Sequence, residues 1–79
     1  MNSDYHNVVV GKKQVLRELK CGKISEIRIA VDCDADYIDL LVAEARKSNA
    51  TYLMRGTMRE LADEFGIDVP SGVVGVVRE

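Results

Sequence analysis

The spacing of apolar residues along this chain switches repeatedly between that of a strand and that of a helix. Strand-like segments are β-branched or alternate apolar with polar residues, whereas helix-like segments repeat apolar residues every three or four positions. The expected strands cover residues 8–10, 24–31, 51–55 and 73–77, and the expected helices cover 12–19, 34–49 and 58–65. Because such alternation favours right-handed crossovers, we predict an α/β fold, a three-layer α/β/α sandwich with a mixed sheet of about four strands.

The ends of the expected helices carry recognisable signals. Thr57 precedes Glu60 by three residues, which is the pattern of a capping box. Asp34 or Asp36 is a suitable N-cap for the longest helix, and Asn49 marks the end of that helix. These residues fix where the helices start and stop more closely than apolar spacing alone.

A length of 79 residues allows one domain, so residues 1–79 are expected to form a single unit with 1–7 as a short or mobile N-terminal segment. A composition of 47% hydrophobic and 30% charged residues excludes a disordered chain. No apolar run approaches the roughly 20 residues of a membrane span, and the polar start lacks a secretory pattern. We therefore expect a cytoplasmic protein that does not contact a membrane.

The net charge of −2 hides an uneven distribution of charge. Six of the 11 basic residues fall between positions 12 and 28, whereas positions 31–45 hold five acids and no base. The total charge gives no hint of a nucleic-acid partner. The distribution predicts an electrically two-sided molecule with a local basic patch.

The residue types that carry metals, cofactors or catalysis are sparse. Cys21, Cys33 and His6 do not provide the four closely paired ligands of a zinc site, and the two thiols are expected to be reduced and largely buried. The acidic run that begins at Asp32 has Tyr37 where a calcium loop needs its turn glycine. No catalytic set can be assembled, so we predict a protein without metal, cofactor or enzymatic activity.

One turn combines features that suit an anion. Gly11 ends a strand and a helix begins at once, which presents free backbone N–H groups and the positive end of the helix dipole. Lys13, Gln14 and Arg17 then project near one another, and lysine and glutamine can reach nucleobase edges. The spacing is not that of a P-loop. The alternative is a solvated polar face of an amphipathic helix.

The loop 67–72 places apolar residues just outside a helix end. Ile67 and Val69 flank Asp68, and Pro70 stiffens the segment. Apolar loop residues either seal the end of a core or meet a partner. Both alternatives remain open, with sealing favoured on structural grounds.

Together these segments resemble the ribosomal L-seven-Ae / L-thirty-e family of kink-turn RNA-binding proteins, above all its short bacterial members. The resemblance covers about 8–77 and rests on three stretches, Gly11-Lys-Lys-Gln-Val-Leu-Arg-Glu-Leu-Lys-Cys-Gly22, Ala30-Val-Asp-Cys-Asp34 and Gly66-Ile-Asp-Val69. It implies a non-catalytic protein that stabilises kink-turn RNA, a bent helix in which tandem sheared G·A pairs lie beside a bulge. It also implies a monomer, a ribosome or riboswitch setting, and no DNA partner.

The resemblance assigns roles to individual residues. The turn and helix start at residues 11–14 match the stretch that reads guanine edges. Arg17 matches a basic position near those bases and phosphates. Asp34 and Ile38 match positions that flank the flipped-out bulge nucleotide, and the loop that begins at Val69 matches the one that covers the bulge. The implied RNA-binding residues are Gly11, Lys12, Lys13, Gln14, Arg17, Lys20, Asp34, Ile38, Val69, Pro70, Ser71 and Gly72.

The chain also departs from the family pattern. Lys13 stands where many members have asparagine, and Gln14 where many have glutamate. Ser71 and Gly72 are smaller or more polar than the usual apolar pair. An alternative function is therefore a protein-interaction module of the same fold, in which the acidic face 32–44 docks a basic partner.

Overall fold

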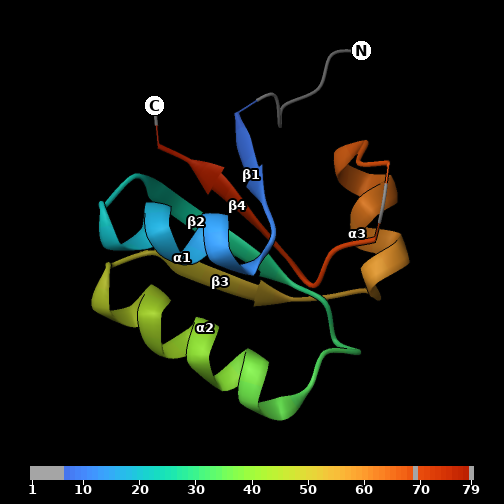
Figure 1. Ribbon diagram of the computed structural model, residues 1–79, viewed down its shortest axis with the longest axis horizontal. Coiled ribbons are helices and arrows are strands. Elements are labelled where there is room, and N and C mark those ends of the chain that lie inside the picture. The colour runs from blue at the N-terminus through green and yellow to red at the C-terminus, as the bar shows by residue number, and fades with distance from the viewer. Residues whose placement is uncertain (1–6, 69, 79) are drawn as a thin grey trace.

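The computed structural model describes residues 7–68 and 70–78, which form one four-stranded sheet with three helices (Figure 1). In chain order the elements are β1 (Val8–Val10), α1 (Lys12–Lys20), β2 (Ile24–Ile29), α2 (Ala35–Lys47), β3 (Thr51–Met54), α3 (Met58–Phe65) and β4 (Val73–Val77). The strand order is β1-β4-β2-β3. β2 and β3 are parallel, and β4 is antiparallel to both β1 and β2. The predicted α/β class with a mixed sheet is confirmed.

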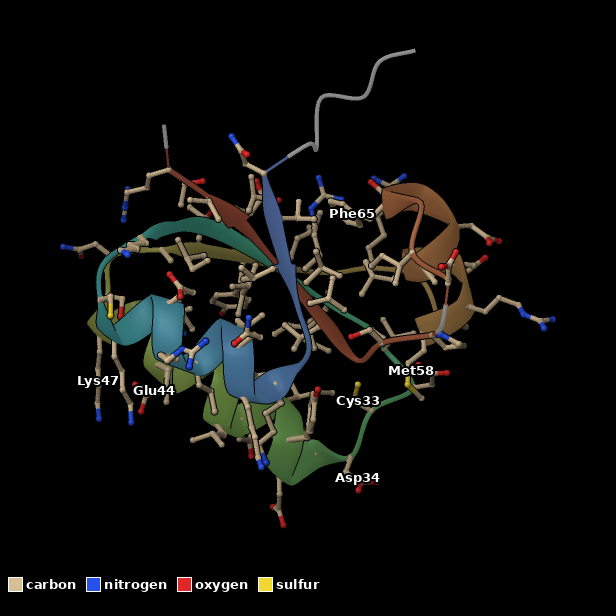
Figure 2. The ribbon with its side chains drawn as sticks, turned by 45° about the horizontal axis from the view of Figure 1, so that its top comes forward. Cys33, Asp34, Glu44, Lys47, Met58 and Phe65 are labelled. Carbon is tan, nitrogen blue, oxygen red and sulfur yellow. The ribbon has the colours of Figure 1, made fainter. Side chains whose placement is uncertain are left out.

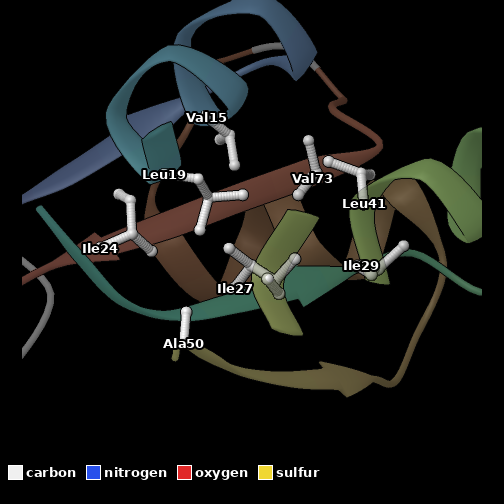
Figure 3. Packing of buried hydrophobic residues seen from close by; sticks show 9 residues of the cluster. Val15, Leu19, Ile24, Ile27, Ile29, Leu41, Ala50 and Val73 are labelled. Atoms are coloured by element: carbon white, nitrogen blue, oxygen red, sulfur yellow. The ribbon is translucent and has the colours of Figure 1, made fainter. Parts of the chain in front are cut away.

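The main core lies between one face of the sheet and the helices α1 and α2 (Figure 3). Apolar residues at helical spacing supply the inner faces of both helices, and alternate residues of β2 and β4 supply the sheet side. Its buried members are Val15, Leu19, Ile24, Ile27, Ile29, Leu41, Ala45, Ala50 and Val73. Gly75 keeps this packing close, because a Cβ there would lie 2.9 Å from Ile24 Cδ1.

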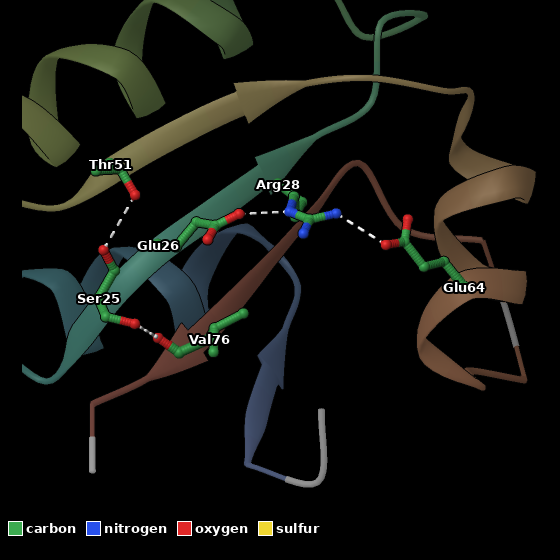
Figure 4. A network of polar contacts seen from close by, with 6 residues as sticks. All are labelled: Ser25, Glu26, Arg28, Thr51, Glu64 and Val76. Atoms are coloured by element: carbon green, nitrogen blue, oxygen red, sulfur yellow. Dashed lines mark hydrogen bonds and ion pairs between the residues drawn. The ribbon is translucent and has the colours of Figure 1, made fainter. Parts of the chain in front are cut away.

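α3 covers part of the opposite face and completes the three layers. Leu61 of α3 is buried against Val74 of β4, the neighbour of Val73 that points to this side. Arg28 of β2 also reaches α3, since its guanidinium lies 2.8 Å from a Glu64 carboxylate oxygen (Figure 4). The guanidinium also lies over the ring of Phe65. A charged residue thus helps to attach the shortest helix to the sheet.

Two expectations from the sequence are wrong. β2 ends at Ile29 instead of continuing to Val31, whose side chain is 50% exposed. The Ala30 and Val31 N–H groups still donate to the carbonyls of Gly72 and Gly56, but these acceptors lie outside β4 and β3, so the paired strands end before Val31. Cys21, expected to be buried, is exposed because it follows the last residue of α1; Cys33 is half-buried.

The helix ends otherwise follow the expected signals. Thr57 and Glu60 form the complete capping box of α3. Asp34 occupies the N-cap position of α2, although its side chain makes no capping hydrogen bond. Within the residues that the structure describes, no helix is long and apolar enough to cross a membrane.

Candidate functional site

The start of α1 is shaped by Gly11. Its φ of +97° lies in the region that favours glycine, and it lets the chain pass from β1 into the helix without an intervening loop. The Gly11 N–H donates to the Val73 carbonyl at 3.2 Å, and the Gly11 carbonyl accepts from Val15 at 2.9 Å. Gly11 brings no side-chain cap, and the first turn holds no acid. The backbone N–H groups in the first turn of α1 are therefore available to water or to a ligand.

Polar and basic side chains surround this helix start. Lys12, Lys13 and Gln14 are all exposed. The exposed Arg17 guanidinium donates to Gln14 Oε1, which confirms that these two side chains meet. Lys13, Arg17 and Lys20 follow one another at intervals of four and three residues, so they form a stripe along one side of the helix. This stripe can neutralise an extended anion.

Lys12 connects the start of α1 to a second feature. Its Nζ atom lies 5.4 Å from the centre of the Tyr37 ring, over the face of the ring. Tyr37 belongs to the first turns of α2 and packs partly against the main core. This cation–π contact places the basic helix start beside the cleft that Tyr37 lines.

The cleft has a volume of about 240 Å³ and is lined by Asp32, Cys33, Asp34, Tyr37, Met58 and Gly72. Asp32, Cys33 and Asp34 come from the connection between β2 and α2, Tyr37 from the first turn of α2, Met58 from the start of α3 and Gly72 from the loop before β4. Cys33, Asp34 and Met58 lie at one end of the molecule in Figure 2. A Cβ at Gly72 would lie 2.8 Å from Cys33 Sγ, so glycine allows the loop to approach the thiol.

The side chains at the bottom of the cleft are held neutral. Burial raises the pKa of the Cys33 thiol, and the carboxylates of Asp32 and Asp34 raise that pKa further. Burial and the neighbouring Cys33 likewise raise the pKa of Tyr37. The thiol donates to the Gly72 carbonyl at 3.5 Å. A phenol, a thiol and a thioether beside two carboxylates can accommodate a flat, uncharged group with polar edges.

The structure brings some of the predicted residues to the cleft and keeps others away. Asp34 and Gly72 line the cleft, and Pro70 is exposed in the loop that leads to it. Ile38 is half-buried and packs against the main core. Ser71 is buried, and its hydroxyl donates to the Val73 carbonyl at 2.9 Å, so it serves the loop. Val69 lies outside the described residues.

Sequence reasoning missed Tyr37 and Met58 as members of the site. Their signal is indirect, because each stands in the first turns of a helix that follows a strand or tight turn. The contact of Asp32 with α3 was also missed: its Oδ1 accepts from the Met58 N–H at 3.0 Å and joins the two helix starts. Ile67 packs partly buried against the α3 cluster, which favours the sealing role for this residue.

Among the described residues, no three histidine, cysteine, aspartate or glutamate side chains are grouped in a way that could hold a metal ion. The acidic run after β2 instead spreads along the start of α2. The site consists of a basic helix start and a cleft that is lined by a phenol, a thiol, a thioether and two carboxylates.

No protein-family model matches the sequence. Curated bacterial proteins are nevertheless similar to this chain over most of its length. A protein of Geobacillus thermodenitrificans called "RNA-binding protein" is 32% identical over 71 residues, which cover 90% of this chain and 87% of that protein. The "RNA-binding protein YbxF" of Geobacillus stearothermophilus is 31% identical with the same coverage.

Solved structures share the fold at lower identity. The 15.5 kD RNA-binding protein of Giardia lamblia superposes with a TM-score of 0.83 at 20% identity, covering 92% of this chain and 62% of that one. This chain thus spans less than two thirds of the Giardia protein. A protein of unknown function from Bacillus halodurans superposes with a TM-score of 0.84 at 17% identity, covering 91% and 72%. These likenesses concern the fold alone.

Proposed function

The chain belongs to the family of YbxF-like RNA-binding proteins, and on that premise we propose that it binds structured RNA through the start of α1 and the adjoining cleft. The observation that carries the proposal is the uncapped helix start with exposed Lys12, Lys13 and Gln14, joined to the cleft by the contact between Lys12 and Tyr37. Neither the start of α1 nor the cleft requires a cofactor or a reacting group for this binding, so the proposed role is non-catalytic.

The finer proposal is that the RNA is a kink-turn. The major groove of a regular A-form helix is too deep and narrow for side chains, so a helix start can enter only where the RNA is bent open. There Lys13 and Gln14 contact the base edges of the sheared G·A pairs. Arg17 and Lys20 contact phosphates along the stripe on α1. These assignments follow from exposure and from the family resemblance.

The cleft gives the bulge of a kink-turn a place to pack. A base that leaves the stack needs a flat apolar surface, and Tyr37 and Met58 offer one between two helix starts. Asp34 lies at its edge, and the loop from Pro70 to Gly72 leads to it. In this arrangement Ser71 and Ile38 support the surface from within.

The test is a titration against a kink-turn RNA and against the same RNA with both G·A pairs replaced by Watson–Crick pairs. Both titrations use one physiological salt concentration, because RNA affinity depends steeply on salt. We expect a loss of at least about a hundredfold on the replaced RNA, the scale of two or more lost base contacts. Equal and weak binding to both RNAs would reject kink-turn recognition.

A second candidate is a protein-interaction module. Asp36 and Asp39 are exposed on α2, and Leu40 beside them is 39% exposed, which gives this helix an acidic surface with an apolar member. A basic protein partner that co-purifies after nuclease treatment and is lost in an Asp36→Asn, Asp39→Asn variant would support this function. Kink-turn binding by that variant at full strength would separate the two surfaces.

A further inference from the structure

A second group of basic side chains lies at the far end of α1 and α2 from the cleft. Both helices end there, and the described segments that meet are 20–25, 46–51 and 77–78. These segments carry five cations and no carboxylate. All five cations are exposed: Lys20, Lys23, Arg46, Lys47 and Arg78. Figure 2 shows Lys47 and the cleft residues at opposite ends of the molecule.

Arg78 holds these segments together. Its N–H donates to the Lys23 carbonyl at 2.7 Å, and its Nε donates to the Gly22 carbonyl at 3.1 Å. The same guanidinium donates to the carbonyls of Ser48 and Asn49, at 3.5 and 3.4 Å. Arg78 therefore fixes the end of β4 against the ends of both helices. Its donors are engaged with the protein, which leaves ligand contacts to the other four cations.

Cations at helix C-termini often only complement the helix dipole. Here several of the last carbonyls of each helix already accept from backbone N–H groups. The Lys23 N–H donates to the Glu18 carbonyl at 3.0 Å, and the Ala50 N–H donates to the Ala45 carbonyl at 2.9 Å. Arg78 adds hydrogen bonds to the carbonyls of Gly22, Ser48 and Asn49, just beyond the two helix ends. The Lys47 side chain is 75% exposed, and its Nζ atom lies 3.8 Å from a carboxylate oxygen of Glu44. An ion pair this open to solvent is too weak to hold the lysine in place.

We propose that Lys20, Lys23, Arg46 and Lys47, together called the basic end, bind the phosphate backbone of an RNA stem that continues beyond the kink. The inference rests on the proposed function and extends its footprint. The stripe from Lys13 to Lys20 runs about 10 Å along α1 and connects the helix start to the basic end. Contacts of this kind add affinity without reading sequence.

The experiment compares a minimal kink-turn RNA with two versions in which one stem or the other is lengthened. The test protein carries Lys23→Gln and Lys47→Gln, and the matched control carries Arg55→Gln and Arg59→Gln, two exposed cations outside the basic end. We expect wild type and control to bind one lengthened RNA at least about fivefold more tightly than the minimal RNA. The test variant should lose that gain, and its salt slope should fall by about one unit or more.

All variants should bind the minimal RNA within about twofold of wild type and unfold at similar temperatures. If lengthening the RNA gives no gain in affinity, or if the test variant keeps that gain, the basic end does not bind RNA. This inference is then overturned, whereas the proposed function is unaffected. If wild type does not distinguish the minimal kink-turn RNA from its Watson–Crick counterpart, the proposed function fails first, and the inference fails with it.

Discussion

The starts of α1 and α3 solve the same physical problem in opposite ways. Each leaves several backbone N–H groups without partners inside the helix. At α3 the Thr57 hydroxyl accepts from the Glu60 N–H at 3.2 Å, Glu60 Oε1 accepts from the Thr57 N–H at 2.8 Å, and Asp32 accepts from Met58. At α1 the N-cap is Gly11, with no side-chain cap and no acid in the first turn.

The difference separates a helix start built for stability from one that can bind. A Ser, Thr, Asp or Asn cap would stabilise the helix by only about a few tenths of a kcal/mol more than the glycine at the start of α1. The amides and the positive dipole end that remain there attract negative charge, and Lys12 and Lys13 strengthen that attraction. At α3 Glu60 and Asp32 already occupy the position that an anion would take. The two helix starts thus have different roles: the start of α3 stabilises the fold, and the start of α1 can bind an anion.

The largest expected effect comes from giving the α1 start a charge like that of α3. Lys13→Glu should weaken kink-turn RNA binding by about a hundredfold or more, because a base contact is lost and a carboxylate faces phosphate. The same change should raise stability by about 0.3–1 kcal/mol, since an acid suits a helix N-terminus. RNA titration and denaturant unfolding measure the two effects.

Arg59→Glu in the first turn of α3 is the matched control for that change. It also places an acid near a helix start, but Glu60 and Asp32 already complement that start, so stability should rise less than in Lys13→Glu. RNA affinity should stay within about twofold of wild type if only the α1 start binds RNA. A comparable loss of affinity in both variants would erase the distinction between the two helix starts.

A smaller effect is expected from removing one neutral contact at the α1 start. Gln14→Ala should cost about 1–3 kcal/mol of RNA binding, the value of one good base-edge contact. The Arg17 guanidinium loses its Gln14 partner in this variant, but its charge remains for phosphate. The salt slope should therefore stay unchanged. Binding at wild-type strength would remove Gln14 from the interface.

Removing the cap of α3 should affect stability alone. Thr57→Ala is expected to lower the unfolding free energy by about 1 kcal/mol, or Tm by roughly 4–8 °C. Glu60→Gln keeps an acceptor for the Thr57 N–H and should cost less. RNA affinity should not change in either variant. An unchanged Tm for Thr57→Ala would show that the capping box contributes little here.

The smallest expected effect concerns the cleft beside the two helix starts. Because the pKa of Cys33 is raised, its thiolate fraction at neutral pH is reduced, and alkylation there should be slow and should accelerate only as pH rises. A Cys21→Ser background isolates this thiol, since Cys21 is exposed. Kink-turn RNA should slow the alkylation further. Equal rates with and without bound RNA would place the RNA away from the cleft.

Local signals in the sequence predicted the elements well because they act over a few residues. The Thr57 and Glu60 pair fixed the start of α3, and apolar spacing identified all the helices and strands. Val31 was misplaced because alternation continues past Ile29, whereas the strand pairing of β2 with β3 and β4 ends at Ile29. Strand order is also invisible locally, so nothing indicated that the apolar residues of β3 would be exposed at a sheet edge.

The candidate site was predictable only in part for the same reason. Gly11, Lys13 and Gln14 form a continuous motif that is visible in the sequence. The cleft is assembled from Tyr37, Met58 and Gly72, which are far apart in the chain and meet only in the fold. The basic end likewise depends on Arg78, whose partners lie at the ends of two different helices.

The strand order has a consequence for how the protein folds while it is being synthesised. β4 is the last strand to be synthesised, yet it lies between β1 and β2 and is the partner that β1 pairs with. Until residues 73–77 emerge, a growing chain can form only the parallel pair of β2 and β3, and the main core lacks Val73. Native folding must therefore wait for residues 73–77, and a premature stop before β4 would release a chain in which β1 lacks the strand that it pairs with.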